Sequence, residues 1–238
     1  MISVCIATYN GEKYILEQLK SIIPQLSSID EIIISDDNSS DKTLELIRSL
    51  KLPMIHIFDN EKEHGYTSNF ENALIHAHGD YIFVSDQDDV WVDNKIRVCL
   101  NYLKKYDFVV SDAIITDSVL SRSDYSYFQE RNPYKSLIGN IIKFGYLGCC
   151  MAFKRELLNM ALPFPHKHKL CTHDNWLFLV ALSSYKVIIT NEKLIYYRRH
   201  GNNTSSGGFL NTTSFMFKIK YRLYLMFHVF YRYILKKI

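Results

Sequence analysis

Several features that would assign this chain of 238 residues to a common class are missing from it. No GxGxxG follows the first apolar segment and no GxxxxGK(S/T) occurs, which excludes a dinucleotide fingerprint and a Walker-type phosphate loop. If a nucleotide binds, side chains and a metal must hold it. The five cysteines are an odd number without a CxxC pair, so we expect free thiols and a reducing, cytoplasmic setting.

We expect neither a membrane-spanning nor a secretory segment from this sequence. No run reaches the ~20 apolar residues that a spanning helix needs, and the apolar N-terminal run is too short, and lacks the basic lead, for a signal peptide. Hydrophobic residues make up 47% and charged residues 22%, which suits a sizeable core and argues against disorder. Charge is uneven: residues 215–238 hold six Lys or Arg and no acid, whereas the other 22 basic and 25 acidic residues leave the body at −3.

Short apolar runs alternate with helical patterns through the first half of the chain, which predicts a parallel sheet with helical crossovers. The expected strands are residues 2–7, 31–35, 54–58, 81–85 and 108–111, and the expected helices are 12–23, 41–50, 67–78 and 93–105. Later we expect a flexible loop at 118–133, close backbone approach at Gly148, helices at 157–162 and 174–182, and strands at 187–190 and 194–197.

Polar clusters follow four of these strands, at residues 8–10, 36–39, 60–65 and 86–89. Each cluster alone is explained by turn and capping chemistry. Because the carboxyl ends of parallel strands lie along one edge of a sheet, the four together predict a ligand site there.

The last cluster places Asp86, Asp88 and Asp89 directly after a buried strand. Carboxylates crowded in this way repel one another and are costly to desolvate. A divalent cation relieves both costs, and hard oxygen ligands suit Mg²⁺ or Mn²⁺, which in turn bind phosphates. The alternative is an ordinary Asp-rich turn that caps the following helix.

Four motifs in this order and spacing make the chain resemble the family-2 glycosyltransferases with the GT-A fold, from Ile2 to about Ser205. They are SVCIATYNG at residues 3–11, EIIISDDNSSD at 31–41, SDQDD at 85–89 and HDNW at 173–176. The DQDDVW variant and YRRHGNNT at 197–204 resemble a bacterial subgroup of rhamnosyl- and glucosyltransferases linked to O-antigen and capsule assembly.

The resemblance implies an α/β GT-A (Rossmann-like) fold, an open and mostly parallel sheet flanked by helices, with a C-terminal amphipathic helix. Residues 1–112 would form the nucleotide-sugar-binding half. Residues 113–208 would form the acceptor and catalytic-base half of the same domain, and residues 209–238 a basic, aromatic tail.

The resemblance also implies a donor site. Asp37 would accept a hydrogen bond from the N–H of a pyrimidine base, and Asn69 would lie near the ribose or diphosphate. The nucleoside pocket would include Thr8, Tyr9 and Glu12. The full set of implied donor-binding residues is Thr8, Tyr9, Asn10, Glu12, Asp37, Asn69, Asp86, Gln87 and Arg198.

For the chemistry, the resemblance implies a metal site and a base. Asp88 would be the main ligand of Mg²⁺ or Mn²⁺, with Asp86 nearby and His200 completing the metal or diphosphate shell. Asp174 would take the proton of the acceptor hydroxyl. From the residues alone, Asp174 could equally be a charge that favours a helix N-terminus, and His200 a structural or exposed histidine.

Two positions depart from the family pattern. Many members carry Glu where this chain has His173, and a basic residue where it has Ser68. Neutralisation of the donor diphosphate would then depend more on the metal, on Arg198 or on His64.

The tail at residues 215–238 is aromatic and basic. At helical spacing, the cations Lys218, Arg222, Arg232 and Lys236 fall on one face, and Met216, Leu223, Phe227, Phe230 and Ile234 on the other, although Lys220 breaks the pattern. This profile is typical of a helix in a membrane interface. The alternative is a helix that packs on the catalytic domain. Nucleic acid is a poor partner, because aliphatic residues interleave the charge.

These observations predict an inverting glycosyltransferase that moves a sugar from a UDP- or dTDP-linked donor to a polyprenyl-diphosphate-linked glycan. It would work in O-antigen or capsule synthesis, in the cytoplasm and peripherally bound to the inner face of the bacterial plasma membrane. The alternatives are a sugar nucleotidyltransferase, whose glycine-rich loop is missing, and a non-catalytic nucleotide- or glycan-binding module.

Overall fold

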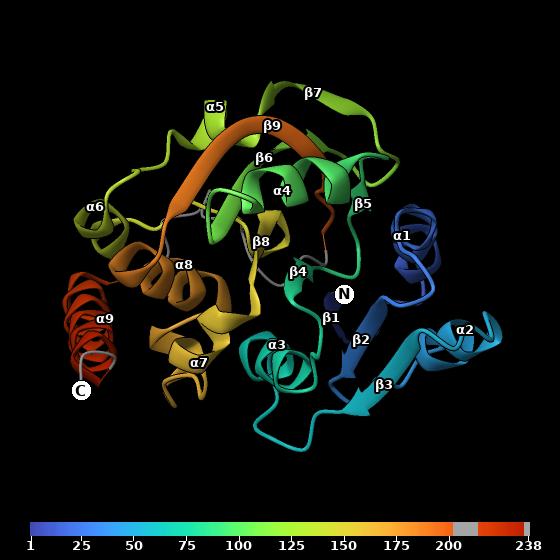
Figure 1. The fold of residues 1–238 in the computed structure, drawn as a ribbon, viewed down its shortest axis with the longest axis horizontal. Coiled ribbons are helices and arrows are strands. Elements are labelled where there is room, and N and C mark those ends of the chain that lie inside the picture. The colour runs from blue at the N-terminus through green and yellow to red at the C-terminus, as the bar shows by residue number, and fades with distance from the viewer. Residues whose placement is uncertain (202–213, 236–238) are drawn as a thin grey trace.

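The computed structural model describes residues 1–201 and 214–235, which form a nine-stranded sheet flanked by helices (Figure 1). The strand order is β3-β2-β1-β4-β8-β6-β9-β5, and β7 pairs with β6 outside this path. The expectation of an open α/β sheet covered by helices is confirmed. Parallel pairing is continuous from β3 to β4, and the second half of the sheet is mixed.

The first half is built from the strands that the apolar runs predict. Its central strands are buried on both faces, so their apolar residues run on without alternation. The strands are β1 (Ile2–Thr8), β2 (Glu31–Asp36), β3 (Ile55–Asp59) and β4 (Tyr81–Ser85). The connections are α1 (Ile15–Ile22), the 3-10 turn η1 (Ile23–Gln25), α2 (Thr43–Ser49) and α3 (Tyr66–Ile75).

The chain reverses its direction across the sheet at β1. It moves from β1 through β2 to β3 on one side, and then returns past β1 to β4 on the other. Right-handed crossovers therefore place α3 on the opposite face from α1 and α2. The loops that leave the carboxyl ends of β1 and β4 diverge at such a reversal and open a crevice between them.

The second half continues the same sheet, since β6 carries the chain past residue 112. The strand β6 pairs antiparallel with β8 and parallel with β9. The strands are β5 (Val90–Trp91), β6 (Phe108–Thr116), β7 (Arg122–Ser126), β8 (Met151–Lys154) and β9 (Val187–Arg198). The helices are α4 (Lys95–Leu103), α5 (Tyr127–Arg131), α6 (Leu137–Ile142), α7 (Leu158–Ala161) and α8 (His173–Ser184), with 3-10 turns η2 (Gly148–Cys150), η3 (Arg155–Leu157) and η4 (His168–Leu170).

Two expectations for this half were wrong. Residues 118–133, expected as a loop, contain β7 and α5. Strand β7 forms by antiparallel pairing with β6. Helix α5 begins at a reciprocal cap in which Ser126 N donates to Gln129 Oε1 at 2.8 Å while Gln129 N donates to Ser126 Oγ at 3.4 Å. The two strands expected between 187 and 197 are the single strand β9. Its exposed residues 191–193 interrupt the apolar pattern, but the pairing with β6 continues through a register shift.

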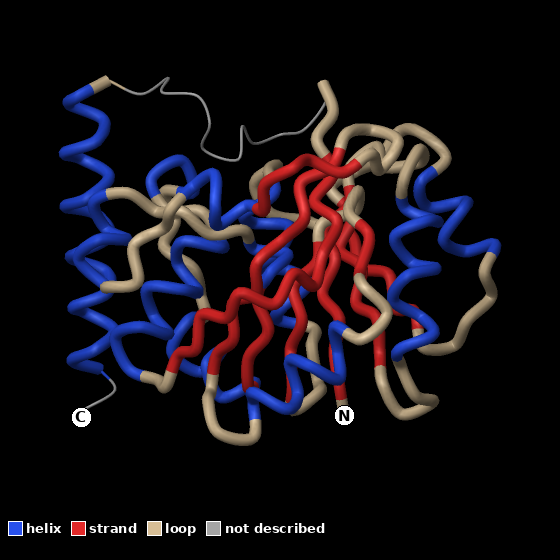
Figure 2. The backbone as a smooth tube through the Cα atoms, turned by 90° about the horizontal axis from the view of Figure 1, so that it is seen from above, coloured by secondary structure: helices blue, strands red, loops and turns tan. Residues whose placement is uncertain are grey.

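Helix α9 (Phe215–Leu235) lies against α8 at one end of the molecule, and α2 lies at the opposite end (Figures 1 and 2). Leu225 and Val229 are buried in this contact, and the Asn175 side-chain amide donates to the Tyr221 hydroxyl. One apolar face of the tail helix therefore packs on the folded domain, as the alternative for the tail predicted.

Two of the cations that helical spacing places on one face of α9 lie against the domain. Arg222 donates to Ile142 O at 2.9 Å and Arg232 to Leu162 O at 3.2 Å, so both point toward the domain. They do so because carbonyls at the ends of α6 and α7 lack helical partners. Lys236 lies outside the described residues. The exposed apolar face of α9 is formed by Met216, Leu223, Phe227, Phe230 and Ile234.

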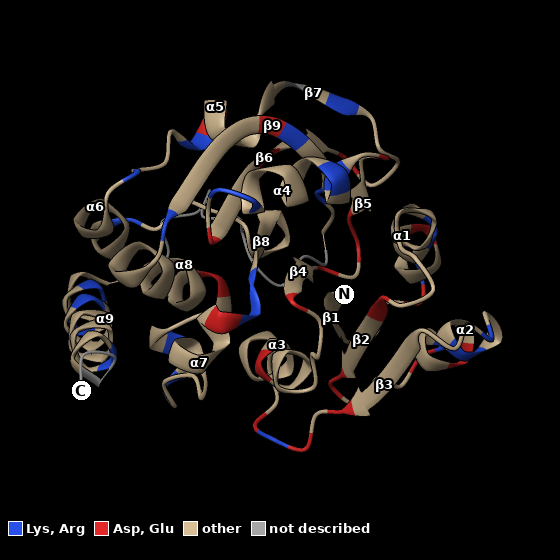
Figure 3. Ribbon diagram, in the orientation of Figure 1, with Lys and Arg blue, Asp and Glu red and all other residues tan. Residues whose placement is uncertain are grey.

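Helix α9 is also unusual in its charge. Figure 3 shows that Lys and Arg are its only charged residues over the described range. Among the residues that the structure describes, no helix is both long enough and apolar enough to cross a bilayer. The described tail thus combines a packed face with an exposed apolar face.

Candidate active site

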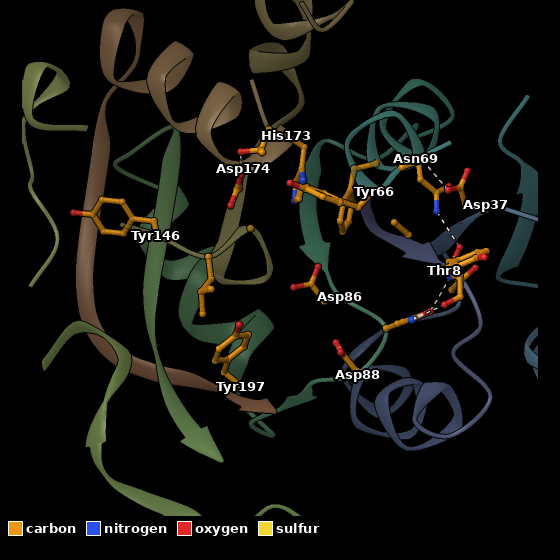
Figure 4. A pocket seen from close by; sticks show the side chains of 18 of the residues that line it. Thr8, Asp37, Tyr66, Asn69, Asp86, Asp88, Tyr146, His173, Asp174 and Tyr197 are labelled. Carbon is orange, nitrogen blue, oxygen red and sulfur yellow. Dashed lines mark hydrogen bonds between the residues drawn. The ribbon is translucent and has the colours of Figure 1, made fainter. Parts of the chain in front are cut away.

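A cavity of about 750 Å³ opens at the carboxyl ends of β1 and β4, where the chain reverses across the sheet (Figure 4). This volume is in the range of small-ligand sites. Its lining combines both halves of the chain. The expected residues that line it are Thr8, Tyr9, Asp37, Asn69, Asp86, Gln87, Asp88 and Asp174.

The nucleotide end of the cavity presents fixed oxygen atoms. Asp37 accepts hydrogen bonds from Gly65 N at 2.8 Å and from Asn60 Nδ2 at 2.7 Å. Gly65 has a φ of 138°, which glycine adopts without strain and which directs its amide to the carboxylate. Asn69 Nδ2 donates to Thr8 O at 3.0 Å, and its buried Oδ1 has no partner among the described residues. These acceptors suit a ligand that brings N–H or O–H donors.

Gln87 links the acidic turn, which is residues 86–89, to the turn after β1. Its Oε1 accepts from Tyr9 N at 2.9 Å, and its Nε2 donates to Tyr9 O at 3.0 Å. A Cβ atom at Gly11 would lie 2.3 Å from Gln87 Oε1, so this contact needs glycine. The Gln87 amide is therefore engaged within the protein, while the exposed Tyr9 ring lines the cavity mouth.

Asn10 and Glu12 do not belong to the cavity lining, and their expected contacts with the donor stay predictions. Asn10 Oδ1 accepts from Ser40 N at 2.8 Å, and Glu12 Oε2 accepts from Lys42 N at 2.9 Å. The loop that leads into α2 leaves backbone amides unpaired, and these two side chains satisfy them. They shape the nucleotide end through that loop.

The acidic turn gathers carboxylates at the base of the cavity. Burial raises the pKa of Asp86 to about 7, and repulsion from Asp88 and Asp174 adds to the shift. Burial also raises the pKa of Asp89, whose Oδ1 accepts from Arg198 N at 2.9 Å. Sequence reasoning noted Asp89 only as part of the motif, and its bond to β9 shows that it holds the turn in place.

Asp88 and His200 are the pair best placed to hold a cation, because His200 Nε2 lies 2.9 Å from Asp88 Oδ2. Asp86 offers a further carboxylate in the cavity. A second group, Asp86, Asp89 and Cys149, has potential ligand atoms within 4.8 Å of one another. A hydrogen bond with the neighbouring thiol and burial raise the pKa of Cys149, and a soft sulfur ligand suits Mg²⁺ or Mn²⁺ less than oxygen ligands do. Carboxylates with one imidazole therefore fit Mn²⁺ or Mg²⁺ better than the second group does.

Arg198 orders the acidic turn instead of lining the cavity. Its Nε donates to Asp88 O at 2.8 Å and its Nη1 to Ser118 O at 2.9 Å. Its Nη2 binds the Glu17 carboxylate, and its guanidinium carbon lies 4.6 Å from the centre of the Tyr14 ring. Arg198 itself does not belong to the cavity lining, and its expected contact with the donor phosphate stays a prediction.

Asp174 lies across the cavity from the acidic turn, in the first turn of α8 (Figure 4). Its Oδ1 accepts from Asn175 N at 2.8 Å and from the Thr172 hydroxyl. These two bonds fix the orientation of the carboxylate. The charge therefore complements the helix N-terminus and is also available to a ligand.

Sequence reasoning missed an aromatic wall. It comes from segments far apart in the chain, so local spacing gives no signal, and the 14% aromatic content was the one hint. The wall consists of Tyr66, Phe70, Tyr127, Phe144, Tyr146 and Tyr197, and Arg131 lies among them. His64 also lines the cavity, with Nδ1 at 3.3 Å from Asp37 Oδ1.

Proteins of similar sequence indicate the family. The model for glycosyl transferase family 2 matches residues 3–160. The dTDP-rhamnosyl transferase RfbG of Shigella flexneri is 31% identical over 252 residues, covering 95% of this chain and 80% of that protein. The Escherichia coli protein WfgD, a UDP-Glc:alpha-D-GlcNAc-diphosphoundecaprenol beta-1,3-glucosyltransferase, is 26% identical, covering 88% of this chain and 81% of its own.

Solved structures share the fold. TarS of S. aureus, residues 1–349 with UDP-GlcNAc, aligns with a TM-score of 0.68 at 20% identity, over 88% of this chain and 61% of that TarS chain. The mannosyltransferase PcManGT of Pyrobaculum calidifontis, with GDP-Man and Mn²⁺, aligns with a TM-score of 0.64 at 20% identity, over 85% of this chain and 58% of its own. Because the sequence match spans most of the chain and the architecture agrees with it, this chain belongs to glycosyl transferase family 2 and is a glycosyltransferase with the GT-A fold.

Proposed function

We propose that this enzyme is an inverting, metal-dependent glycosyltransferase. It moves a sugar from a UDP- or dTDP-linked donor to a lipid-linked glycan in the synthesis of a bacterial surface polysaccharide such as O-antigen or capsule. The observation that carries the proposal is the placement of Asp174 opposite Asp86 and Asp88 across one cavity. Inverting transfer needs a base on one side of the anomeric carbon and charge stabilisation on the other.

In the proposed reaction an acceptor hydroxyl oxygen attacks the anomeric carbon of the donor. The bond between that carbon and the diphosphate oxygen breaks, and the diphosphate leaves with the electron pair. The hydroxyl proton passes to the Asp174 carboxylate. The bonds from Thr172 and Asn175 favour this role, because they hold the carboxylate in one orientation before the acceptor arrives.

The donor nucleotide binds at the end of the cavity formed by Asp37 and Asn69. Asp37 Oδ2 accepts one hydrogen bond, from Gly65 N, and keeps a second lone pair for the imide N–H of uracil or thymine. The named activities of the two relatives, with dTDP- and UDP-linked sugars, support a pyrimidine donor.

Asp88, Asp86 and His200 would hold Mg²⁺ or Mn²⁺ beside the donor diphosphate. The cation would supply positive charge to the leaving group. The Mn²⁺ complex of PcManGT supports a metal for this fold. Arg198 contributes by fixing the turn that carries Asp88 and Asp89.

The acceptor would enter past the aromatic wall, where Tyr127, Tyr146 and Tyr197 offer flat faces and hydroxyls to a sugar. Arg131, in the same lining, supplies a cation on this side of the cavity. The diphosphoundecaprenol acceptor in the name of WfgD supports a lipid-linked glycan as the acceptor class.

A lipid-linked acceptor is confined to a bilayer, so the enzyme would work at the cytoplasmic membrane surface. The exposed apolar face of α9, which includes Leu223 and Phe227, and the cations Lys218 and Lys220 suit insertion among anionic headgroups. Because Tyr221 on the same helix binds Asn175, beside Asp174, membrane contact would hold the catalytic cavity near its acceptor.

The proposal is tested with Asp174→Asn, which keeps the shape of the side chain and removes the base. With Mn²⁺, a pyrimidine sugar nucleotide and a long-chain alkyl diphosphate glycan, transfer should fall by about 10²–10⁴-fold. The donor affinity measured by calorimetry should change by less than about twofold, because donor binding does not require the base. Asp93→Asn, at an exposed position, is the matched control.

Near-normal transfer by the Asp174→Asn protein would remove this residue as the base. If the affinities for UDP and dTDP are the same with and without Mn²⁺, the result would instead favour a nucleotide-binding module without a catalytic metal.

A further inference from the structure

His173 stands in the wall of the catalytic cavity with its ring enclosed by protein. Its side chain lines the cavity, yet the residue is only 5% exposed. The imidazole stacks on Phe70 with ring centres 4.0 Å apart and meets the Tyr66 ring edge-on at 5.8 Å. A Cβ atom at Gly148 would lie 2.4 Å from His173 Nε2, so the glycine makes room for the ring.

Both ring nitrogens of His173 lack a hydrogen-bond partner among the described residues. Leaving a buried polar atom unpaired is costly, and buried polar side chains in native proteins usually have at least one partner. A histidine kept only for packing would be expected to have at least one partner. The imidazole is therefore arranged for a group that arrives with a ligand.

The ring is also neutral. Burial lowers the pKa of His173 to about 4, although the neighbouring Asp174 acts in the opposite direction. A neutral imidazole has one N–H donor and one nitrogen acceptor. This pair matches a sugar hydroxyl, which can both accept and donate a hydrogen bond.

The position of the His173 ring indicates that its partner is the transferred sugar and not the nucleotide or the acceptor. In Figure 4, His173 lies between Asp174 and Tyr66 and above Asp86. Asp174 and Asp86 both act electrostatically on the Tyr66 hydroxyl, so these side chains surround one space. In the proposed reaction that space, between the base and the metal-binding turn, holds the anomeric carbon and its ring.

Contacts with helix α3 place His173 on the donor side of the cavity. Phe70 and Tyr66 belong to this helix, and Gly65, just before it, donates to Asp37 at the nucleotide end. The ring of His173 is thus held by the element that also forms the donor end. The tyrosines proposed to meet the acceptor, Tyr127, Tyr146 and Tyr197, lie outside α3.

We propose that the imidazole of His173 hydrogen-bonds a hydroxyl of the donor sugar and so contributes to the choice of that sugar. This inference rests on the proposed function. A buried site that must pair with a hydroxyl disfavours a sugar that lacks the hydroxyl or presents it in the other configuration.

The test distinguishes the contribution of the sugar to donor affinity from that of the nucleotide. Calorimetry with Mn²⁺ is carried out on the full chain with UDP, dTDP, UDP-glucose, UDP-N-acetylglucosamine, dTDP-glucose and dTDP-rhamnose. The variant His173→Phe keeps an aromatic ring on Phe70 and removes both nitrogens. We expect UDP and dTDP to bind within twofold of the wild type, and the preferred sugar nucleotide to lose about 5–10-fold, so that the order among donors flattens.

Two further variants keep the test independent of misfolding. Gly148→Ala acts from the other side of the ring by displacing Nε2, and it should reproduce the sugar-specific loss. His166→Phe, at an exposed position outside the cavity lining, should change neither class of ligand. Thermal melts of each variant show that the compared proteins are folded.

An equal loss for nucleoside diphosphates and sugar nucleotides would make His173 structural and overturn the inference. An unchanged order of donors in both cavity variants would overturn it too. If the wild type binds neither UDP nor dTDP, the proposed function fails, and the inference falls with it.

Discussion

The buried imidazole of His173 makes the stability of this protein depend on pH. The ordinary histidine pKa of 6.5 is lowered to about 4 in the folded chain, because burial disfavours the charged ring more than Asp174 favours it. In the unfolded chain the ring returns to water and to its ordinary pKa. Between these two values the unfolded state binds more protons than the folded state, so the free energy of unfolding falls as the pH is lowered.

The magnitude follows from the separation of the two pKa values. The contribution of His173 is fully present above pH 6.5 and is lost progressively toward pH 4. At pH 5 the loss is about 2 kcal/mol, and the complete loss below pH 4 is about 3 kcal/mol. This is a large part of the net stability of a typical domain.

Urea unfolding at pH 7.5 and at pH 5 measures this effect. Other groups titrate in the same range, so the test is the difference between the wild type and His173→Phe. The wild type should lose about 2 kcal/mol more than the variant over this interval. His166→Phe, at an exposed position, should follow the wild type. Equal losses for the wild type and His173→Phe would refute a buried neutral imidazole in the folded protein.

Three further outcomes are expected. Asp88→Ala should abolish the gain in UDP affinity that Mn²⁺ provides and reduce transfer at least 10²-fold, measured by calorimetry and product formation. Arg198→Ala removes a buried guanidinium from Glu17 and two carbonyls, and should lower the urea-derived free energy of unfolding by about 2–4 kcal/mol. Replacing Leu223 and Phe227 together by Gln should weaken binding to phosphatidylglycerol vesicles about tenfold or more without lowering Tm, since both side chains are exposed; unchanged binding would remove α9 as the membrane contact.

The sequence by itself determined the order of strands and helices in the first half. Apolar runs, helical periodicity and turn residues are local properties, and parallel strands send their carboxyl ends to one edge. The placement of Asp37, Asp86 and Asp88 in one cavity follows from that rule. Asp174 needed the family resemblance, because an acid at a helix start is common for reasons of charge alone.

Only the tertiary structure decided which polar side chains face the ligand and which serve the protein. Arg198 Nε donates to Asp88 O and Glu12 Oε2 accepts from Lys42 N, and neither contact can be predicted from local sequence. Local sequence is limited in the same way for the tail. Its periodicity predicts two faces of α9, but it does not predict which face packs on α8. The buried environment of His173 is formed by Phe70 and Gly148, which come from distant segments of the chain and meet only in the folded protein. Local pattern fixes the elements because it depends on neighbouring residues, whereas the environment of a side chain depends on contacts that exist only after the elements have packed.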